Sequence, residues 1–135
     1  AKMELGRVAK IMEGEFRPGH FDGVVEVVYR FLEIVKPTHT FFGEKDLQQL
    51  SIVRRMVKEF DLPVEVVGCN TFRLEGGLAA SSRNERLTED QKVKALILFQ
   101  SLDRVRKEKL EYGPREAREK VKEWFQDSEL ELEYI

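Results

Sequence analysis

Two helix–strand pairs that follow one another with short links constrain the fold of this chain most strongly. Residues 22–36 carry valines and Phe31 at helical spacing, and residues 38–42 (THTFF) are typical of a short strand. A second helical pattern spans residues 45–60, and residues 62–69 are almost continuously apolar, as in a strand covered on both faces. This order predicts an α/β fold with a parallel sheet and right-handed crossovers, as in the later half of a Rossmann-like domain.

The apolar stripes of these two helices predict which of their side chains form the core. The stripe of the first helix consists of Val24, Val27, Val28, Phe31 and Val35, and that of the second consists of Leu47, Leu50, Val53, Val57 and Phe60. The single cysteine, Cys69, ends the second strand, and we expect it to be a small buried residue.

The sequence changes character after residue 72. Residues 73–87 are polar and rich in Gly, Ala and Ser, which indicates a loop at a domain junction. Thr88 and Gln91 have the spacing of a capping box, so we expect a helix from there to about Lys109. Its inward side chains are expected to be Val93, Leu96, Ile97, Leu102 and Val105.

A further helix and a strand are expected in the remaining residues. Gly113-Pro114 predicts a helix with proline in its first position, and its inward side chains are Ala117, Val121, Trp124 and Phe125. Residues 129–135 (ELELEYI) alternate like a strand that has nothing after it to pair with, so we expect a fragment. We assign residues 1–72 to the C-terminal part of the Rossmann-like domain and residues 73–135 to part of a small α+β domain.

Composition excludes several classes of protein. Apolar residues make up 41% of the 135 residues, which is enough for a packed core, and the net charge of −2 favours neither a general nucleic-acid binder nor a polybasic membrane binder. No apolar stretch approaches the roughly 20 residues that span a bilayer, and no signal peptide is visible. One cysteine allows no intrachain disulfide, so we expect a reducing cytoplasm. No metal site is expected, because His and Cys are few and the acids are scattered.

Residues 42–50 (FGEKDLQQL) lie where a strand ends and a helix begins. Ligands bind beyond the carboxyl ends of parallel strands, and free N–H groups at a helix start favour phosphate. Gly43 allows close approach of a ligand, Lys45 reaches phosphate oxygens, Asp46 accepts from ribose hydroxyls, and Gln49 shares the face of Asp46. The alternative is an ordinary solvated helix start. Lys45 argues against it, because a cation in the first turn opposes the helix dipole.

Two other stretches carry candidate site residues. In residues 79–84 (AASSRN), Ser81, Ser82 and Arg83 form a plausible phosphate clamp, and the preceding Gly76-Gly77 gives the loop room to close. The alternative is a polar linker capped by Asn84. In residues 17–21 (RPGHF), Arg17 and His20 are candidates, although a histidine in a turn is more often a structural hydrogen bonder.

These stretches together resemble the pantoate–beta-alanine ligase (pantothenate synthetase) family. The resemblance rests on RPGHFDGV, FGEKDLQQL with the following IVRRMV, VEVVG and GLAASSRNERLT, and it covers roughly residues 15–100. It implies a domain of the class I nucleotidyltransferase type. The family's N-terminal H-x-G-H signature is absent, so we expect a fragment that is inactive by itself.

The resemblance implies an activity. Members of the family condense pantoate with beta-alanine through a pantoyl adenylate, using ATP as a substrate and releasing AMP and pyrophosphate, which produces pantothenate for coenzyme A. It further implies assistance from Mg²⁺, whose ligands it does not assign to this chain, and a homodimeric intact protein. Neither a nucleic acid nor a membrane is expected as a partner. The alternatives are a non-catalytic nucleotide-binding module and another adenylate-forming nucleotidyltransferase.

The resemblance also implies roles for individual residues. Lys45 would act at the α-phosphate as the catalytic cation, and Gln49 would contact pantoate beside the valines that follow RPGHFDG. The ATP-binding residues would be Gly43, Glu44, Lys45, Asp46, Phe72, Ala80, Ser81, Ser82 and Arg83. The last four resemble a mobile triphosphate loop analogous to the KMSKS loop of class I aminoacyl-tRNA synthetases, although the family usually has Met or Leu at Ala80. We expect a bound triphosphate between Lys45 and Arg83 in a closable cleft.

Overall fold

The computed structural model describes residues 2–108 and 113–135, which divide between Thr71 and Phe72 into two compact units. The first unit contains the 3₁₀ turn η1 (Gly6–Ala9), α1 (Glu13–Phe16), α2 (His20–Val35), β1 (His39–Gly43), the 3₁₀ turn η2 (Glu44–Asp46), α3 (Leu47–Glu59) and β2 (Glu65–Cys69). The second contains the 3₁₀ turns η3 (Glu75–Gly77) and η4 (Ser82–Arg86), followed by α4 (Glu89–Lys107) and α5 (Pro114–Gln126).

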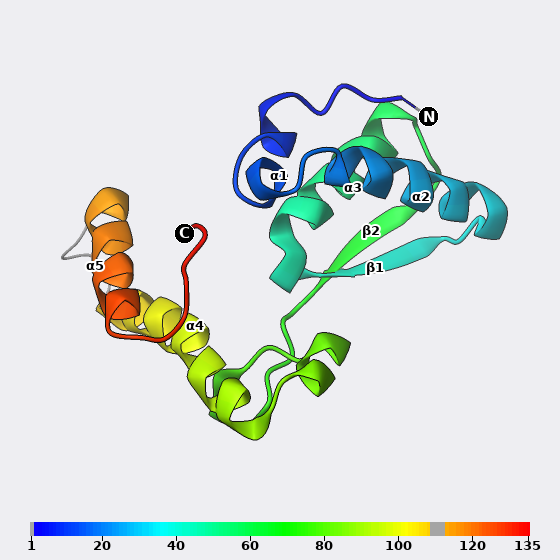
Figure 1. The fold of residues 1–135 in the computed structure, drawn as a ribbon. Coiled ribbons are helices and arrows are strands. Elements are labelled where there is room, and N and C mark those ends of the chain that lie inside the picture. Colours follow the sequence, from blue (N-terminus) through cyan, green and yellow to red (C-terminus); the bar gives the residue numbers. More distant parts are fainter. Residues whose placement is uncertain (1, 109–112) are drawn as a thin grey trace. The chain divides into compact units, whose positions relative to one another are not determined.

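The two strands of the first unit form a parallel pair. Thr40 lies opposite Val66 and Gly43 lies opposite Cys69, so both strands end at the same edge. α3 connects them, and Figure 1 shows α2 and α3 on one side of the strands. The predicted α/β fold with a parallel sheet is therefore confirmed.

The core of the first unit lies between its helices and the sheet. α2 contributes Phe21, Val25 and Leu32, and α3 contributes Ile52, Val53 and Met56. Phe42 and Val66 pack against this cluster from the strands. The alternation of strand side chains puts Phe41 on the other face of the sheet, where it is 66% exposed.

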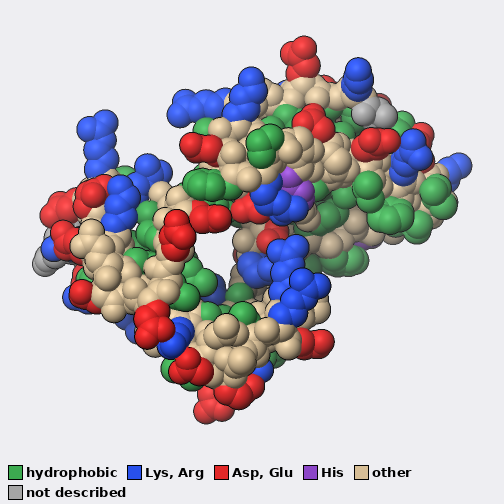
Figure 2. Space-filling model, viewed as in Figure 1, with side chains coloured by type: hydrophobic (Ala, Val, Ile, Leu, Met, Phe, Trp, Pro, Cys, Tyr) green, Lys and Arg blue, Asp and Glu red, His purple; other side chains and the backbone are tan. Residues whose placement is uncertain are grey.

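Some predicted core positions of the first unit are wrong. Leu50 and Val53 are buried as expected, but Leu47, the first residue of α3, is 62% exposed, because the buried residues of that helix begin at Leu50. Phe31 and Val35 of α2 are also exposed, and Figure 2 shows hydrophobic side chains on the surface over the end of that helix. Cys69 is exposed rather than buried, because it is the last residue of β2.

β2 is shorter and less covered than expected. It begins at Glu65 rather than at residue 62, and its residues 66–68 are half-buried. Among the described residues the sheet has two strands, and α2 and α3 lie on one side of it. The apolar sequence thus predicted the strand correctly, but the prediction that both of its faces are covered is wrong for this unit.

The second unit is built on two helices with well-defined starts. The capping box of α4 is confirmed: Gln91 N–H donates to Thr88 Oγ1 over 3.2 Å, and Thr88 N–H donates to Gln91 Oε1 over 2.9 Å. Pro114 is the first residue of α5, as predicted. α4 ends at Lys107, and the expected end at Lys109 lies outside the described residues.

The two helices of the second unit pack through one side of each. Val121 and Phe125 of α5 are buried, and the Arg104 guanidinium of α4 lies 4.3 Å from the centre of the Trp124 ring. Val93 and Leu102 were expected to face inward, but they are 66% and 53% exposed. The side of α4 that α5 does not cover therefore carries apolar residues, which periodicity alone cannot distinguish from core.

The predicted terminal strand is wrong. Residues 131–135 have no regular secondary structure, and in the part of the chain that the structure describes no strand pairs with them. Instead, Leu130, Leu132 and Tyr134 line a hollow of about 360 Å³ beside Phe125 of α5. Alternation alone does not make a strand, because the backbone N–H and C=O groups need a partner strand.

Within residues 2–108 and 113–135, no helix is both long enough and apolar enough to cross a bilayer.

Candidate functional site

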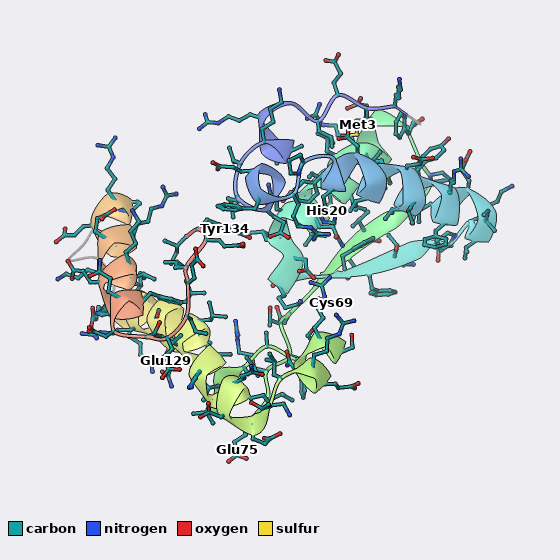
Figure 3. All side chains as sticks on the ribbon, viewed as in Figure 1. Met3, His20, Cys69, Glu75, Glu129 and Tyr134 are labelled. Atoms are coloured by element: carbon teal, nitrogen blue, oxygen red, sulfur yellow. The ribbon has the colours of Figure 1, made fainter. Side chains whose placement is uncertain are left out.

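The junction after β1 brings the first set of predicted site residues to the end of the sheet. Gly43 is the last residue of β1, and η2 (Glu44–Asp46) leads directly into α3. Gly43 lies opposite Cys69, which Figure 3 labels at the end of β2, so this is the carboxyl end of both strands. Nothing lies within 4 Å of the position that a Cβ on Gly43 would occupy. A ligand could therefore approach the backbone closely here.

Lys45 and Asp46 are exposed at this junction. Lys45 Nζ lies 3.5 Å from Asp46 Oδ1, the only ion pair of Lys45 among the described residues. An exposed pair of this kind stabilises little, because water solvates both charges. The Lys45 ammonium is therefore free to turn toward an anionic ligand at small cost.

Sequence reasoning missed Arg54 and Gly68, which lie beside this junction and the predicted Glu44. A Cβ on Gly68 of β2 would lie 3.0 Å from Arg54 Nη2 and 3.4 Å from Glu44 Oε1. The glycine thus leaves room for both side chains over the end of the sheet. The available signal was a glycine inside a strand pattern, which often marks close approach of another group.

A hollow of about 640 Å³ in the first unit brings Gln49 together with the start of α2. Its walls are the turn 17–20, one face of α2 and the Gln49 side chain. The α2 face consists of Gly23, Val24, Val27 and Val28. Figure 3 labels His20 at the start of that helix. The RPGHF and FGEKDLQQL stretches therefore meet at one hollow, although 20 residues separate them in the sequence.

The hollow combines apolar and polar groups. The valines supply an apolar wall, and the Gln49 side chain makes no hydrogen bond with another described residue. Arg17 Nη1 lies 3.0 Å from Glu13 Oε1 and 3.4 Å from His20 Nε2. Such a lining suits a small branched aliphatic molecule with hydrogen-bonding groups.

The remaining predicted site residues lie in the second unit, in a loop closed by backbone hydrogen bonds. Ala80 N–H donates to Phe72 O over 2.9 Å, and Arg73 and Ala79 form an antiparallel bridge. Asn84 Nδ2 donates to Ala79 O over 3.0 Å. The Phe72 side chain is 74% exposed. The loop is thus a defined structure, in which Asn84 caps the backbone of residue 79.

The two serines of this loop differ in their contacts. Ser81 Oγ accepts from Arg83 N–H over 3.2 Å and so caps η4, whereas Ser82 and the Arg83 side chain are exposed. Among the described residues, no ion pair involves the Arg83 guanidinium. Ser81 therefore holds the turn, while Ser82 and Arg83 remain accessible to a ligand.

The glycines of this loop have a packing role that sequence reasoning did not predict. Gly76 and Gly77 have φ values of +85° and +102°, and a Cβ on Gly77 would overlap the Phe99 ring of α4. The Arg73 guanidinium lies 4.5 Å from the centre of the same ring. The glycines thus let the loop pack closely on α4. The predicted role of the glycines, which is to let the loop close on a ligand, is separate from this packing.

The predicted site residues belong to different units. Gly43, Lys45 and Gln49 lie in the first unit, and Phe72 and residues 80–83 lie in the second. A common cleft between Lys45 and Arg83 therefore stays a prediction. Across residues 2–108 and 113–135, no three His, Cys, Asp or Glu side chains gather as metal ligands, so the structure assigns no residue to Mg²⁺.

Comparison with known proteins gives consistent matches along this chain. The profile of the pantoate-beta-alanine ligase family matches residues 1–135. Pantothenate synthetase from Staphylococcus epidermidis is 48% identical over 117 residues, which are 87% of this chain and 41% of the relative. The enzyme from Flavobacterium psychrophilum is 46% identical over 129 residues, which are 92% of this chain and 44% of the relative.

Solved structures match the fold as well. The crystal structure of pantothenate synthetase from Thermus thermophilus has a TM-score of 0.84 and 42% identity, covering 93% of this chain and 46% of that one. Pantoate-beta-alanine ligase from Francisella tularensis, complexed with beta-gamma ATP and beta-alanine, has a TM-score of 0.72 and 33% identity, covering 91% and 45%. The chain thus spans less than half the length of these relatives.

Proposed function

The chain belongs to the pantoate–beta-alanine ligase family, and from this membership we propose that it is part of a longer enzyme that joins pantoate to beta-alanine with ATP. The Francisella tularensis relative, which is described with an ATP compound and beta-alanine, supports ATP and beta-alanine as substrates. The intact protein is a cytoplasmic homodimer in this proposal. The chain alone is inactive, because it spans less than half of its relatives.

The proposed reaction has two steps. A carboxylate of pantoate attacks the α-phosphorus of ATP, and pyrophosphate leaves with the electrons of the broken P–O bond. The amine of beta-alanine then attacks the resulting mixed anhydride, and AMP leaves. The first step gives a poor acyl donor a good leaving group, so the protein must hold the phosphates and keep water from the anhydride.

The assignment of pantoate as the acid substrate rests on the hollow beside Gln49. Pantoate has two methyl groups on one carbon, two hydroxyls and a carboxylate. Val24, Val27 and Val28 offer an apolar wall for the methyl groups, and the Gln49 amide offers hydrogen bonds for the hydroxyls. Arg17 also lines the hollow, with its guanidinium paired to the Glu13 carboxylate over 3.0 Å. The methyl groups and the hydroxyls of the substrate therefore have complementary groups in the lining.

The junction after β1 supports binding of ATP in this proposal. The open space over Gly43 suits close approach of the nucleotide, Asp46 suits the ribose hydroxyls, and Lys45 suits the α-phosphate, where negative charge develops. Glu44 borders the same site. In the second unit, the backbone of Phe72 would contact the adenine, and Ala80, Ser81, Ser82 and Arg83 suit the triphosphate. Mg²⁺ would assist with phosphate charge.

Pantoate-dependent exchange of labelled pyrophosphate into ATP tests the proposal. The intact parent protein is expected to catalyse exchange only when pantoate is present, and the 135-residue chain is expected to catalyse none. Other hydroxy acids serve as controls for the acid substrate. Exchange with another acid and not with pantoate would favour a different adenylate-forming transferase. Nucleotide binding by the intact parent without exchange would favour a non-catalytic module.

A further inference from the structure

The two adjacent glutamines of α3 have different surroundings. Gln49 borders the hollow, as described above. Gln48 instead donates through Nε2 to two backbone carbonyl oxygens, Val8 O over 2.7 Å and Ile11 O over 2.8 Å. Its Oε1 is buried and has no hydrogen-bond partner among the described residues. The contacts of Gln48 therefore join α3 to a segment 37–40 residues earlier in the chain.

That segment leads directly into the wall of the hollow. Ile11 O, which accepts from Gln48, also accepts from Gly14 N–H over 3.0 Å. Arg17 N–H then donates to Glu13 O over 2.9 Å, and His20 N–H donates to Arg17 O over 3.1 Å. A short series of backbone hydrogen bonds thus connects the point held by Gln48 to the turn 17–20.

Close packing makes this connection stiff. Gly14 is buried, and a Cβ there would overlap the backbone carbonyl group of Ala9. The backbone of residue 14 therefore packs directly on the carbonyl group of Ala9. A displacement of residues 8–11 would be passed on to the turn 17–20 rather than absorbed between them.

We propose that Gln48 is a positioning residue, which holds residues 8–11 on α3 and thereby fixes the turn 17–20 opposite Gln49. Gln48 itself touches no substrate. It sets the width of the hollow and the position of Arg17, while its neighbour Gln49 makes the contact. The identity of the acid that is affected rests on the proposed function, but the mechanical role of Gln48 does not.

Arg55 provides a matched control on the same helix. Its guanidinium also donates to two backbone carbonyl oxygens of the N-terminal segment, Glu4 O over 2.8 Å and Leu5 O over 3.1 Å. These acceptors precede η1 and do not adjoin the turn 17–20. Arg55→Met therefore removes the same number of hydrogen bonds to backbone carbonyls as Gln48→Met, together with the exposed ion pair to Glu59 over 3.5 Å, without acting on the hollow.

Amide hydrogen exchange on the 135-residue chain tests the mechanical role independently of activity. Gln48→Met keeps a similar volume and removes both donors, so exchange at residues 14–20 is expected to accelerate about 30-fold, as the loss of two net hydrogen bonds implies. Gln48→Glu, which turns a carboxylate toward two carbonyls, is expected to accelerate it more. Arg55→Met is expected to leave exchange at residues 14–20 within about twofold of the wild type.

Kinetics of the intact parent protein test the consequence for the site. Gln48→Met is expected to raise KM for pantoate about tenfold and to leave KM for ATP within about twofold. Unchanged exchange at residues 14–20 in both Gln48 variants, or a rise in the pantoate KM that Arg55→Met equals, would overturn the proposal. A wild-type parent without pantoate-dependent turnover would refute the proposed function instead, and the exchange comparison would then decide the role of Gln48 alone.

Discussion

The substitution Gly77→Ala tests how the loop of the second unit is held on α4. Gly77 has a φ of +102°, where an L-residue is strained by about 1–2 kcal/mol. The new Cβ would overlap the Phe99 ring, and overpacking of this kind costs a further 1–3 kcal/mol, roughly. Gly77→Ala is therefore expected to lower the free energy of unfolding of the second unit by roughly 2–5 kcal/mol.

The neighbouring glycine separates strain from overlap. Gly76 has a φ of +85°, but a Cβ there would lie 3.3 Å from Leu96 Cδ1, the end of a flexible side chain. Gly76→Ala is expected to cost only the backbone strain, about 1–2 kcal/mol. The difference between the two variants thus reports the contact with Phe99.

Urea unfolding followed by tryptophan fluorescence measures both effects. Trp124, the one tryptophan of the chain, lies in α5 and reports on the second unit. Phe99→Leu in the Gly77→Ala background is expected to recover part of the loss, because the smaller side chain gives way to the new methyl group. Equal unfolding free energies for Gly76→Ala and Gly77→Ala would refute the packing of Gly77 against Phe99.

Three further predictions concern charge and the site. Asp103 accepts hydrogen bonds from Lys107 and Arg106, and these lower its pKa from the ordinary 3.8, with the larger effect from Lys107. Ionised Asp103 therefore stabilises the folded state above that pH. Asp103→Asn is expected to destabilise the chain at pH 7. The difference in urea midpoint between wild type and variant is expected to vanish as the pH falls below about 3.8 and through the lowered pKa of Asp103. A constant difference down to about pH 2 would contradict this. In the intact parent, Lys45→Ala is expected to slow single-turnover adenylate formation by about 10²–10³-fold, and an unchanged rate would remove Lys45 from the mechanism. Gln49→Leu is expected to raise KM for pantoate about tenfold by removing its hydrogen bonds, with KM for ATP as the internal control; equal changes in both constants would argue against a pantoate contact.

The sequence predicted the order of the elements from α2 to α5, because local signals and the fold agree there. Helical spacing predicted α2 and α3, the capping box predicted the start of α4, and Pro114 predicted the start of α5. These signals depend on residues within one or two turns of each other. They are therefore readable without knowledge of the tertiary structure.

Sequence-based prediction failed where a neighbouring element decides the outcome. Periodicity put Leu47, Val93 and Leu102 inward, but each lies where no other element of the described chain covers it. Alternation predicted a strand over the last residues, but no strand lies beside them to pair with in the described parts of the chain. Burial and strand pairing depend on contacts that are distant in sequence, so local patterns do not determine them.

The candidate site shows the same division. The resemblance assigned Gln49 and the valines to the acid substrate, and the structure lines one hollow with them. Gln48 contacts residues 37–40 positions earlier in the chain, and Gly77 packs against Phe99, which lies 22 positions later. No local pattern around these residues indicated either contact.

A crystal structure of the intact protein with pantoate and a non-hydrolysable ATP analogue would decide where both substrates bind. We expect pantoate in the hollow between Gln49 and the α2 valines, and a triphosphate that contacts Lys45 and Arg83. Pantoate bound elsewhere, or a triphosphate that contacts neither cation, would contradict this expectation.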